Sequence, residues 1–195
     1  ISSSTGISLN QKYATLFGYI SAICKTVDVS TGFDYNIMRK KFDFTPIGEK
    51  AALKAKETSN AKKIQSDYCD VILEPEAVSS LFSNTFISHL FAESVDKNRS
   101  FLKGKIGEKI TNLTMIDDGT IDYGVASANF DGDGNPTKRN VVLEKGVLKQ
   151  YLYDDFYGKK FGIESTGNSE RDYKSLPSIS TTNFIIEGDK IEGIR

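Results

Sequence analysis

The strongest periodic pattern in the chain is an apolar stripe that follows Pro75. Apolar residues recur there at spacings of three and four, with Thr85 and His89 in the same register. This spacing places side chains along one side of an α-helix. We therefore expect residues 76–95 to form the longest helix of the chain and to bury Val78, Leu81, Phe82, Phe86 and Leu90.

Two further patterns precede this stripe. Residues 7–24 alternate small and apolar positions, which favours a strand, whereas residues 31–44 are aromatic-rich and irregular. Thr45 and Pro46 then suit the N-cap and first turn of a helix. Apolar residues spaced by four follow in a Lys- and Glu-rich run, which predicts a solvated helix ending near residue 60. They are Ile47, Ala51 and Ala55.

Shorter strand signals occupy the second part of the chain. Residues 68–73 are a short, largely apolar run that stops before Pro75, as a buried strand would. Lys145 and Gly146 lie between two β-rich runs, so residues 139–153 are predicted to form a hairpin. Antiparallel strands are expected to dominate this region.

The last elements are short. Residues 154–161 favour a helix that stops at Gly162, because glycine readily adopts the left-handed conformation that ends many helices. Residues 184–186 favour one more strand, followed by a turn at Gly188 and Asp189.

Together these patterns predict an α+β chain, mainly antiparallel β-sheet with one long amphipathic helix. The polar, Lys-rich residues 54–63 are the best candidate for a linker between domains, so we place a domain boundary near residue 65. The boundary separates residues 1–65 from residues 66–195. The chain opens on Ile1 in a Ser/Thr-rich segment, and we expect it to be a fragment of a larger protein.

Composition narrows the function classes. The chain has 25 Lys and Arg against 26 Asp and Glu, a net charge of −1, which argues against direct nucleic-acid binding. No apolar stretch approaches the roughly 18 to 20 residues of a membrane helix, so no membrane partner is expected. Cys24 and Cys69 are too few for a disulfide framework, which favours a cytoplasmic location. One histidine and two cysteines 45 residues apart do not readily assemble a conventional zinc site.

The most suggestive local motif is the beginning of a calcium loop. Asp131, Asp133 and Asn135 occupy its positions 1, 3 and 5. Position 6 should be glycine but is Pro136, and position 12 should be glutamate but is Val142. A turn in which Asp and Asn bond their own backbone is the simpler interpretation, with calcium as the alternative.

Three other candidates have structural interpretations. His89 is the only histidine, and its place in the apolar stripe favours a core or interface role over a base or metal ligand. Asp117 and Asp118 point to opposite faces if the segment is extended, so a turn is favoured over an acid–base pair. The Gly-rich residues 165–169 offer amides to an anion or a peptide, but they lack the Lys-Ser ending of a P-loop.

Six phrases occur in a characteristic order from about residue 68 onward. They are VILEP at 71–75, SFLKGKIGEKI at 100–110, FDGDG at 130–134, LEKGVL at 143–148, STGN at 165–168 and TN at 182–183. Through these phrases the chain resembles the TldD/PmbA family, long labelled modulators of DNA gyrase and classed with zinc-dependent peptidases. The resemblance implies that residues 1–65 are the family's middle region and residues 66–195 the first part of its C-terminal α+β domain.

The resemblance also identifies which positions are altered. In the TldD branch the corresponding helix carries His-Glu-x-x-x-His, whose histidines hold zinc and whose glutamate is the general base. Here Ser83 stands at the first histidine, Asn84 at the glutamate and Ser88 at the second histidine. His89 is one residue out of register, about 100° around a helix. The chain therefore resembles the PmbA (TldE) branch, with no catalytic residue, metal or cofactor site expected.

This branch implies a non-catalytic subunit of a TldD/PmbA-type zinc-dependent peptidase assembly, acting in proteolysis or peptide maturation. The expected partner is a TldD-type zinc-bearing subunit, or a second copy, in a dimer that encloses an unfolded peptide substrate. Two alternatives stay open. The protein could itself be a metallopeptidase that uses residues outside this fragment, which stoichiometric zinc would reveal. It could also be a gyrase-associated binding module, which would bind gyrase without a TldD-type partner.

Overall fold

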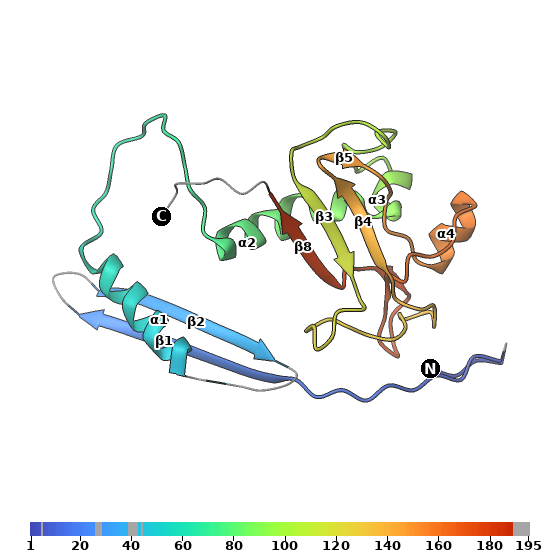
Figure 1. Ribbon diagram of the computed structural model, residues 1–195, viewed down its shortest axis with the longest axis horizontal. Coiled ribbons are helices and arrows are strands. Elements are labelled where there is room, and N and C mark those ends of the chain that lie inside the picture. The colour runs from blue at the N-terminus through green and yellow to red at the C-terminus, as the bar shows by residue number, and fades with distance from the viewer. Residues whose placement is uncertain (5, 26–28, 39–42, 44, 189–195) are drawn as a thin grey trace. The chain divides into compact units, whose positions relative to one another are not determined.

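A computed structural model describes residues 1–4, 6–25, 29–38, 43 and 45–188 (Figure 1). The chain divides into two compact units. One is Lys12–Ile72, and the other combines Ile1–Gln11 with the chain from Leu73 onward. In the part of the chain that is described, no helix is both long and apolar enough to cross a bilayer. The domain boundary near residue 65, placed from the Lys-rich residues 54–63, stays a prediction.

The unit Lys12–Ile72 is an antiparallel hairpin with a helix packed on one face (Figure 1). Strands β1 (Leu16–Lys25) and β2 (Val29–Met38) pair in continuous register along their full length. Helix α1 (Thr45–Glu57) follows and ends in the 3-10 turn η1 (Thr58–Asn60). The predicted helix is confirmed, and the residues that it buries are Ile47, Ala51 and Ala55.

Gly32 allows α1 to lie directly against the hairpin. A Cβ at Gly32 would overlap the Ala51 carbonyl oxygen and the Ala55 amide nitrogen, both of them helix backbone atoms. The Ser30 hydroxyl donates a hydrogen bond to the Ala55 carbonyl at 2.7 Å. A side chain larger than hydrogen at Gly32 would therefore push the helix away from the strand.

Strand β2 contradicts one expectation. Residues 31–44 were expected to be irregular, yet residues 31–38 belong to a regular strand, while 39–42 and 44 lie outside the described residues. The positions of β2 that face α1 include Gly32 and the buried Asp34. Because neither is a large apolar residue, the alternation typical of a half-buried strand is hidden in the sequence.

The second unit is built on a four-stranded antiparallel sheet in the order β5-β4-β3-β8 (Figure 1). Strand β3 lies between β4 and β8, so β8 is an edge of the sheet. A separate two-stranded ladder joins β6 (Ser169–Glu170) to β7 (Ser178–Ile179). The strands of the main sheet are β3 (Thr114–Asp118), β4 (Arg139–Glu144), β5 (Val147–Leu148) and β8 (Asn183–Glu187).

Several short helices complete this unit, and together with the sheet they confirm the predicted α+β class. The helix predicted over residues 76–95 is divided into separate pieces, and α1 is longer than any of them, so that prediction is wrong in length. The pieces are α2 (Pro75–Thr85), η2 (Ile87–Leu90) and α3 (Ala92–Asp96), and α4 (Asp155–Phe161) follows later in the chain.

The core of this unit joins residues that lie far apart in the sequence. Its members come from η2, from α3 and the turn that follows it, from strands β3, β4, β5 and β7, and from the segment after β5. They are Leu90, Ala92, Val95, Leu102, Met115, Val142, Leu143, Leu148, Tyr151, Leu152, Tyr153 and Ile179. Such a core forms only when these distant segments come together.

The hairpin and the late helix follow their local signals. Lys145 and Gly146 join β4 to β5 with φ of 47° and 85°, the positive values that a tight hairpin turn requires. The carboxylate of Asp154 accepts a hydrogen bond from the Tyr157 amide at 2.7 Å and so caps α4. Gly162 ends α4 with φ of 69°. The predicted helix is confirmed, and the predicted hairpin is confirmed over residues 139–148, whereas residues 149–153 are not part of its ladder.

Two remaining strand predictions have opposite outcomes. Residues 184–186 lie in β8, as expected, whereas Asp189 of the predicted turn lies outside the described residues. Residues 68–73 are not a buried strand, because Tyr68 is fully exposed and Ile72 is 75% exposed. An apolar run becomes a buried strand only beside another strand, and this run has no strand partner in the described part of the chain.

Candidate functional site

The positions singled out by the family resemblance lie on α2 and η2. Pro75 begins α2, where its missing N–H leaves no helical bond unmade. Asn84 and Thr85 each donate a side-chain hydrogen bond to the carbonyl four residues earlier, at 2.8 and 2.6 Å. Such bonds compete with the backbone ladder. The helix ends at Thr85, and Phe86, with φ of −115°, leads into the tighter η2 turn.

The apolar stripe packs through aromatic edges rather than by complete burial. Of the five side chains expected to be buried, only Leu90 is buried, and Leu81 is 48% exposed. The ring of Phe86 lies 5.6 Å from that of Phe82 and 5.8 Å from that of Phe101, edge to face in both pairs. The half-buried members are Val78, Phe82 and Phe86.

The three altered family positions face solvent. Ser83, Asn84 and Ser88 are all exposed. The break at Phe86 separates Ser83 on α2 from Ser88 on η2. Hydroxyl and carboxamide groups are poor zinc ligands and are not bases at neutral pH. These side chains therefore offer neither metal coordination nor proton abstraction.

The neighbouring His89 does not complete a zinc site. Its ring packs edge-on against Phe101 at 4.6 Å between centroids, and its Nδ1 is buried with no hydrogen-bond partner among the residues that the structure describes. Among the described residues, no group of three or more His, Cys, Asp or Glu side chains is placed to hold a metal ion. Cys24 and Cys69 are free thiols of the Lys12–Ile72 unit. The residues present do not fit zinc.

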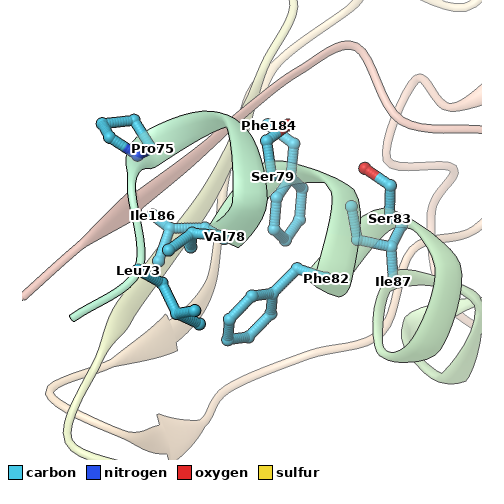
Figure 2. A pocket seen from close by; sticks show the side chains of 9 residues that line it. All are labelled: Leu73, Pro75, Val78, Ser79, Phe82, Ser83, Ile87, Phe184 and Ile186. Carbon is cyan, nitrogen blue, oxygen red and sulfur yellow. The ribbon is translucent and has the colours of Figure 1, made fainter. Parts of the chain in front are cut away.

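An apolar pocket of about 390 Å³ lies between α2 and strand β8 (Figure 2). Figure 2 shows the side chains of Val78 and Phe82 projecting from α2 into the same space as Leu73. None of the lining side chains is ionisable, so the pocket offers apolar contact and two hydroxyl groups. The lining residues are Leu73, Pro75, Val78, Ser79, Phe82, Ser83, Ile87, Phe184 and Ile186.

This pocket was not expected from the sequence. Phe184 and Ile186 are two positions apart on β8, so they point to the same side of the sheet. Local periodicity predicts that strand but carries no information on which helix it will meet. About a hundred residues separate β8 from α2, and only the folded chain brings them together.

Asp117 and Asp118 close strand β3 and do not form an acid–base pair. The Asp117 carboxylate is fully buried and accepts hydrogen bonds from the Asn168 amide at 2.7 Å and the Thr182 N–H at 2.6 Å. Burial raises the pKa of Asp117, while these two bonds oppose the rise. The Asp118 carboxylate instead lies 3.7 Å from the Arg139 guanidinium. The two carboxylates therefore contact different parts of the fold: Asp117 bonds to Asn168 and Thr182, whereas Asp118 lies beside Arg139.

The Asp131 segment is a turn, as the simpler interpretation expected. One carboxylate oxygen of Asp131 accepts from the amides of Asp133 and Asn135, at 3.0 and 2.9 Å, and the other from Ser169 at 3.1 Å. Burial raises the pKa of Asp131. Because backbone donors already engage both oxygens, the arrangement favours a structural role over calcium binding.

The polar groups of the Gly-rich residues 165–169 are also engaged in hydrogen bonds within the protein. The Thr166 amide donates to the Tyr153 carbonyl at 3.1 Å, and the Gly167 amide to the Ser165 hydroxyl at 3.1 Å. Thr166 is buried, and its hydroxyl accepts from the Tyr153 amide at 2.8 Å. These amides are therefore not open to an anion or a peptide.

Comparison with known proteins defines the class to which this fold and site belong. Residues 66–193 match the family described as PmbA/TldA metallopeptidase C-terminal domain. The chain therefore belongs to the TldD/PmbA family. Other relatives carry the names metalloprotease TldD homolog and metalloprotease PmbA homolog.

Individual relatives show how much of the family fold this chain represents. It is 42% identical over 174 residues to an uncharacterised protein of Methanocaldococcus jannaschii, covering 88% of this chain and 42% of that protein. TldE of Thermococcus kodakarensis superposes with a TM-score of 0.83 at 27% identity, covering 96% of this chain and 44% of that chain. A Thermotoga maritima protein described as a candidate modulator of a DNA gyrase superposes with a TM-score of 0.79 at 31% identity, covering 88% and 40%. The chain thus spans about two fifths of these relatives.

Proposed function

We propose that this chain belongs to a metal-free subunit of a TldD/PmbA-type zinc-dependent peptidase assembly, in which a zinc-bearing partner performs catalysis. The observation that carries the proposal is the chemistry of Ser83, Asn84 and Ser88, three exposed side chains that supply no zinc ligand and no general base. The chain shares its fold with TldE of Thermococcus kodakarensis. The free thiols of Cys24 and Cys69 suit a reducing, cytoplasmic location.

Peptide hydrolysis has a chemical requirement that the side chains of α2 do not meet. Hydrolysis of a peptide requires an activated water molecule. The activation commonly comes from a metal ion that lowers the pKa of the water, or from a positioned base. The pocket beside α2 has no ionisable lining residue, and the residues around His89 do not fit zinc. Catalysis is therefore assigned to the partner, and this subunit helps to enclose the substrate.

The α2 pocket and the neighbouring strand suit an extended peptide. Strand β8 is an edge of the main sheet, and an edge strand can pair with an incoming peptide through main-chain hydrogen bonds. Phe184 and Ile186 line the adjacent pocket, which is large enough for an apolar side chain. Main-chain pairing depends little on sequence, as the handling of varied unfolded peptides requires.

The proposal is tested by comparing three samples on one unfolded peptide: this chain, a TldD-type partner with intact His-Glu-x-x-x-His, and their mixture. We expect no cleavage by this chain alone and the highest cleavage by the mixture. A chelator should abolish the activity of the mixture. Metal analysis of this chain after purification should find zinc far below one atom per molecule.

A partner variant with Gln in place of the motif glutamate is the matched control, because it retains the partner's surface while removing its base. The mixture made with that variant should be inactive. Chelator-sensitive cleavage with stoichiometric zinc by the full-length protein that contains this chain, assayed without a partner, would refute the assignment and favour a metallopeptidase. Binding of gyrase without a TldD-type partner, together with no effect on cleavage, would favour a gyrase-associated binding module.

A further inference from the structure

A single side chain fixes the end of the ladder between β3 and β8. The last pair of that ladder is Asp118 and Asn183, and Asn183 is the first residue of β8. The carboxamide nitrogen of Asn183 donates to the Asp118 carbonyl at 2.7 Å and to the Ser127 hydroxyl at 2.8 Å. Its carboxamide oxygen accepts from the Ala126 amide at 3.0 Å. The side chain therefore ties β8 both to β3 and to the loop that follows β3.

That loop, residues 119–128, is folded tightly on itself. The Gly124 amide donates to the Ile121 carbonyl, and the Ser127 amide donates to the Gly124 carbonyl, both at 3.1 Å. The Ser127 hydroxyl donates to the Ile121 carbonyl at 2.6 Å. Tyr123 has a φ of 59°, a left-handed conformation that is unfavourable for a residue with a side chain. The loop therefore depends on contacts that hold it in this conformation.

Gly124 is required for Asn183 to reach the loop. A Cβ at Gly124 would lie 2.8 and 2.9 Å from the carboxamide nitrogen and oxygen of Asn183, and it would also overlap the Ser127 hydroxyl. The carboxamide would have to move away and give up its hydrogen bonds. The contact of Gly124 with Asn183, together with the bonds of Asn183 to Asp118, Ala126 and Ser127, is here named the Asn183 clamp.

The chemistry of the clamp explains why asparagine stands at position 183. Asparagine is a poor strand former, so strand propensity does not favour it there. The clamp needs one group that donates and one that accepts, which a short carboxamide supplies. Aspartate would present an acceptor to the Asp118 carbonyl where Asn183 presents a donor. Hydrogen bonding therefore determines the residue type at this position.

The clamp belongs to the strand that the proposed function uses. In the part of the chain that is described, β8 pairs with β3 alone. Phe184 and Ile186 of β8 line the pocket beside α2 (Figure 2). The Thr182 amide, just before β8, donates to the Asp117 carboxylate at 2.6 Å. Together with the clamp, this bond fixes the start of a short strand that is held from one side and would otherwise fray.

We propose that Asn183 is a positioning residue for peptide binding: through the clamp, it holds the start of β8 in the extended conformation with which a peptide pairs. This inference rests on the proposed function, because it concerns the same edge strand. A binding surface that is fixed in advance loses less conformational freedom when its ligand binds. Without the clamp, Tyr123 would relax from its left-handed conformation and the start of β8 would move. Peptide binding would then have to order both again.

The test measures peptide binding without cleavage. The full-length protein that contains this chain is mixed with the partner variant that has Gln in place of the motif glutamate. The probe is a fluorescein-labelled peptide of about ten alternating Val and Thr residues, followed by fluorescence anisotropy. We expect Asn183→Ala to raise the dissociation constant about tenfold.

Two further variants accompany Asn183→Ala, and circular dichroism verifies that all three are folded. Ser127→Ala removes one of the three hydrogen bonds of the Asn183 carboxamide. It should raise the dissociation constant by a smaller factor, and it replaces Asn183→Ala if that variant does not fold. Asn112→Ala is the matched control, because it removes an exposed carboxamide near the other end of β3. It should leave the dissociation constant unchanged.

A double-mutant cycle distinguishes the clamp from a general loss of stability. Gly124→Ala should raise the dissociation constant as Asn183→Ala does. Added to Asn183→Ala, it should have little further effect, because the carboxamide that it displaces is already absent. With the active partner, both single variants should raise the KM for the same peptide and leave kcat unchanged. A merely destabilised subunit would instead lower kcat at unchanged KM, because fewer molecules would be competent.

Three results would overturn the inference. Equal peptide affinity of the native protein and both single variants would show that the clamp does not position β8 for binding, while the proposed function would stand. A fall in kcat at unchanged KM, or additive effects in the cycle, would reduce the clamp to a structural role. Absence of peptide binding by the native mixture would overturn this inference together with the peptide-binding part of the proposed function.

Discussion

The two compact units bury their interiors in contrasting ways. In Lys12–Ile72, the hairpin and α1 follow one another along the chain, and the helix rests on Gly32 through small residues such as Ala51 and Ala55. In the other unit, large side chains from distant segments meet, for example Leu90 and Ile179. The first unit therefore depends mainly on neighbouring segments, whereas the second depends on the whole chain from Leu73 onward.

The units also differ in what they leave open. The Lys12–Ile72 unit has two layers, the hairpin and α1, so one sheet face and its aromatic side chains remain exposed. The other unit buries the Asp117 carboxylate completely and satisfies it with hydrogen bonds. Small units bury a smaller fraction of their surface, so an exposed apolar face is expected where only two thin layers meet.

The largest expected effect is in the core built from distant segments. Leu143→Ala removes a completely buried side chain from β4. We expect the free energy of unfolding measured with urea to fall by about 3 to 4 kcal/mol, since the cavity cannot close in a core shared by several segments. Hydrogen exchange should accelerate in β3, β4 and β8 more than in α1. A loss below about 1 kcal/mol would show that this core repacks readily.

The second-largest effect tests whether the Lys12–Ile72 unit is stabilised independently of the other unit. Gly32→Ala would insert a methyl group into the backbone of α1, so the helix must move off the hairpin. We expect a loss of about 2 to 3 kcal/mol, confined to this unit. Hydrogen exchange should accelerate in α1, β1 and β2, while β3 and β4 keep their protection. Equal loss of protection in both units would contradict the view that they are stabilised separately.

A smaller effect concerns the buried carboxylate. The pKa of Asp117 is raised above its ordinary 3.8 by burial, so the folded state binds this proton more tightly than the unfolded state. Its stabilising contribution is complete below pH 3.8 and is lost as the pH rises through the raised value. Asp117→Asn removes this titration. Relative to the native protein, the variant should therefore gain stability as the pH rises from below 3.8 to neutrality.

Urea unfolding of both proteins across this pH range measures the difference. The carboxyl groups of Asp131 and Asp154, whose pKa values burial also raises, are common to both proteins and cancel. Any hydrogen bond that the introduced carboxamide fails to make shifts the whole curve but not its slope. Parallel pH profiles would show that Asp117 titrates alike in the folded and unfolded states.

The smallest expected effect is a gain in stability rather than a loss, and it serves as the control for Gly32→Ala. Gly48 lies in α1, and a Cβ there would meet only the Ile20 side chain, at an ordinary 3.6 Å. Gly48→Ala should stabilise the protein by about 0.5 to 1 kcal/mol, because alanine loses less backbone freedom in a helix. The melting temperature should rise slightly. A fall would mean that α1 packs more tightly at Gly48 than the geometry indicates.

The elements predicted correctly are those with a complete local signal. The turn at Lys145 and Gly146, the Asp154 cap and the Gly162 stop each act within a few residues, so the chain forms them in almost any context. The altered positions Ser83, Asn84 and Ser88 are likewise visible in the sequence. The apolar periodicity did not predict that the long helix breaks near Phe86, because it does not register the local hydrogen bonds that Asn84 and Thr85 donate to backbone carbonyls.

The amino-acid sequence by itself determined the α+β class, the β4–β5 hairpin, helices α1 and α4, and the absence of a zinc-binding motif at α2. Only the tertiary structure decided which faces are covered. It placed Phe184 and Ile186 against α2, buried Asp117 beside Asn168, and left residues 68–73 exposed. The physical reason is the sequence separation over which each feature is decided. Caps, turns and periodicity depend on residues close together in the sequence, whereas burial depends on which distant segments meet. No local pattern carries that information.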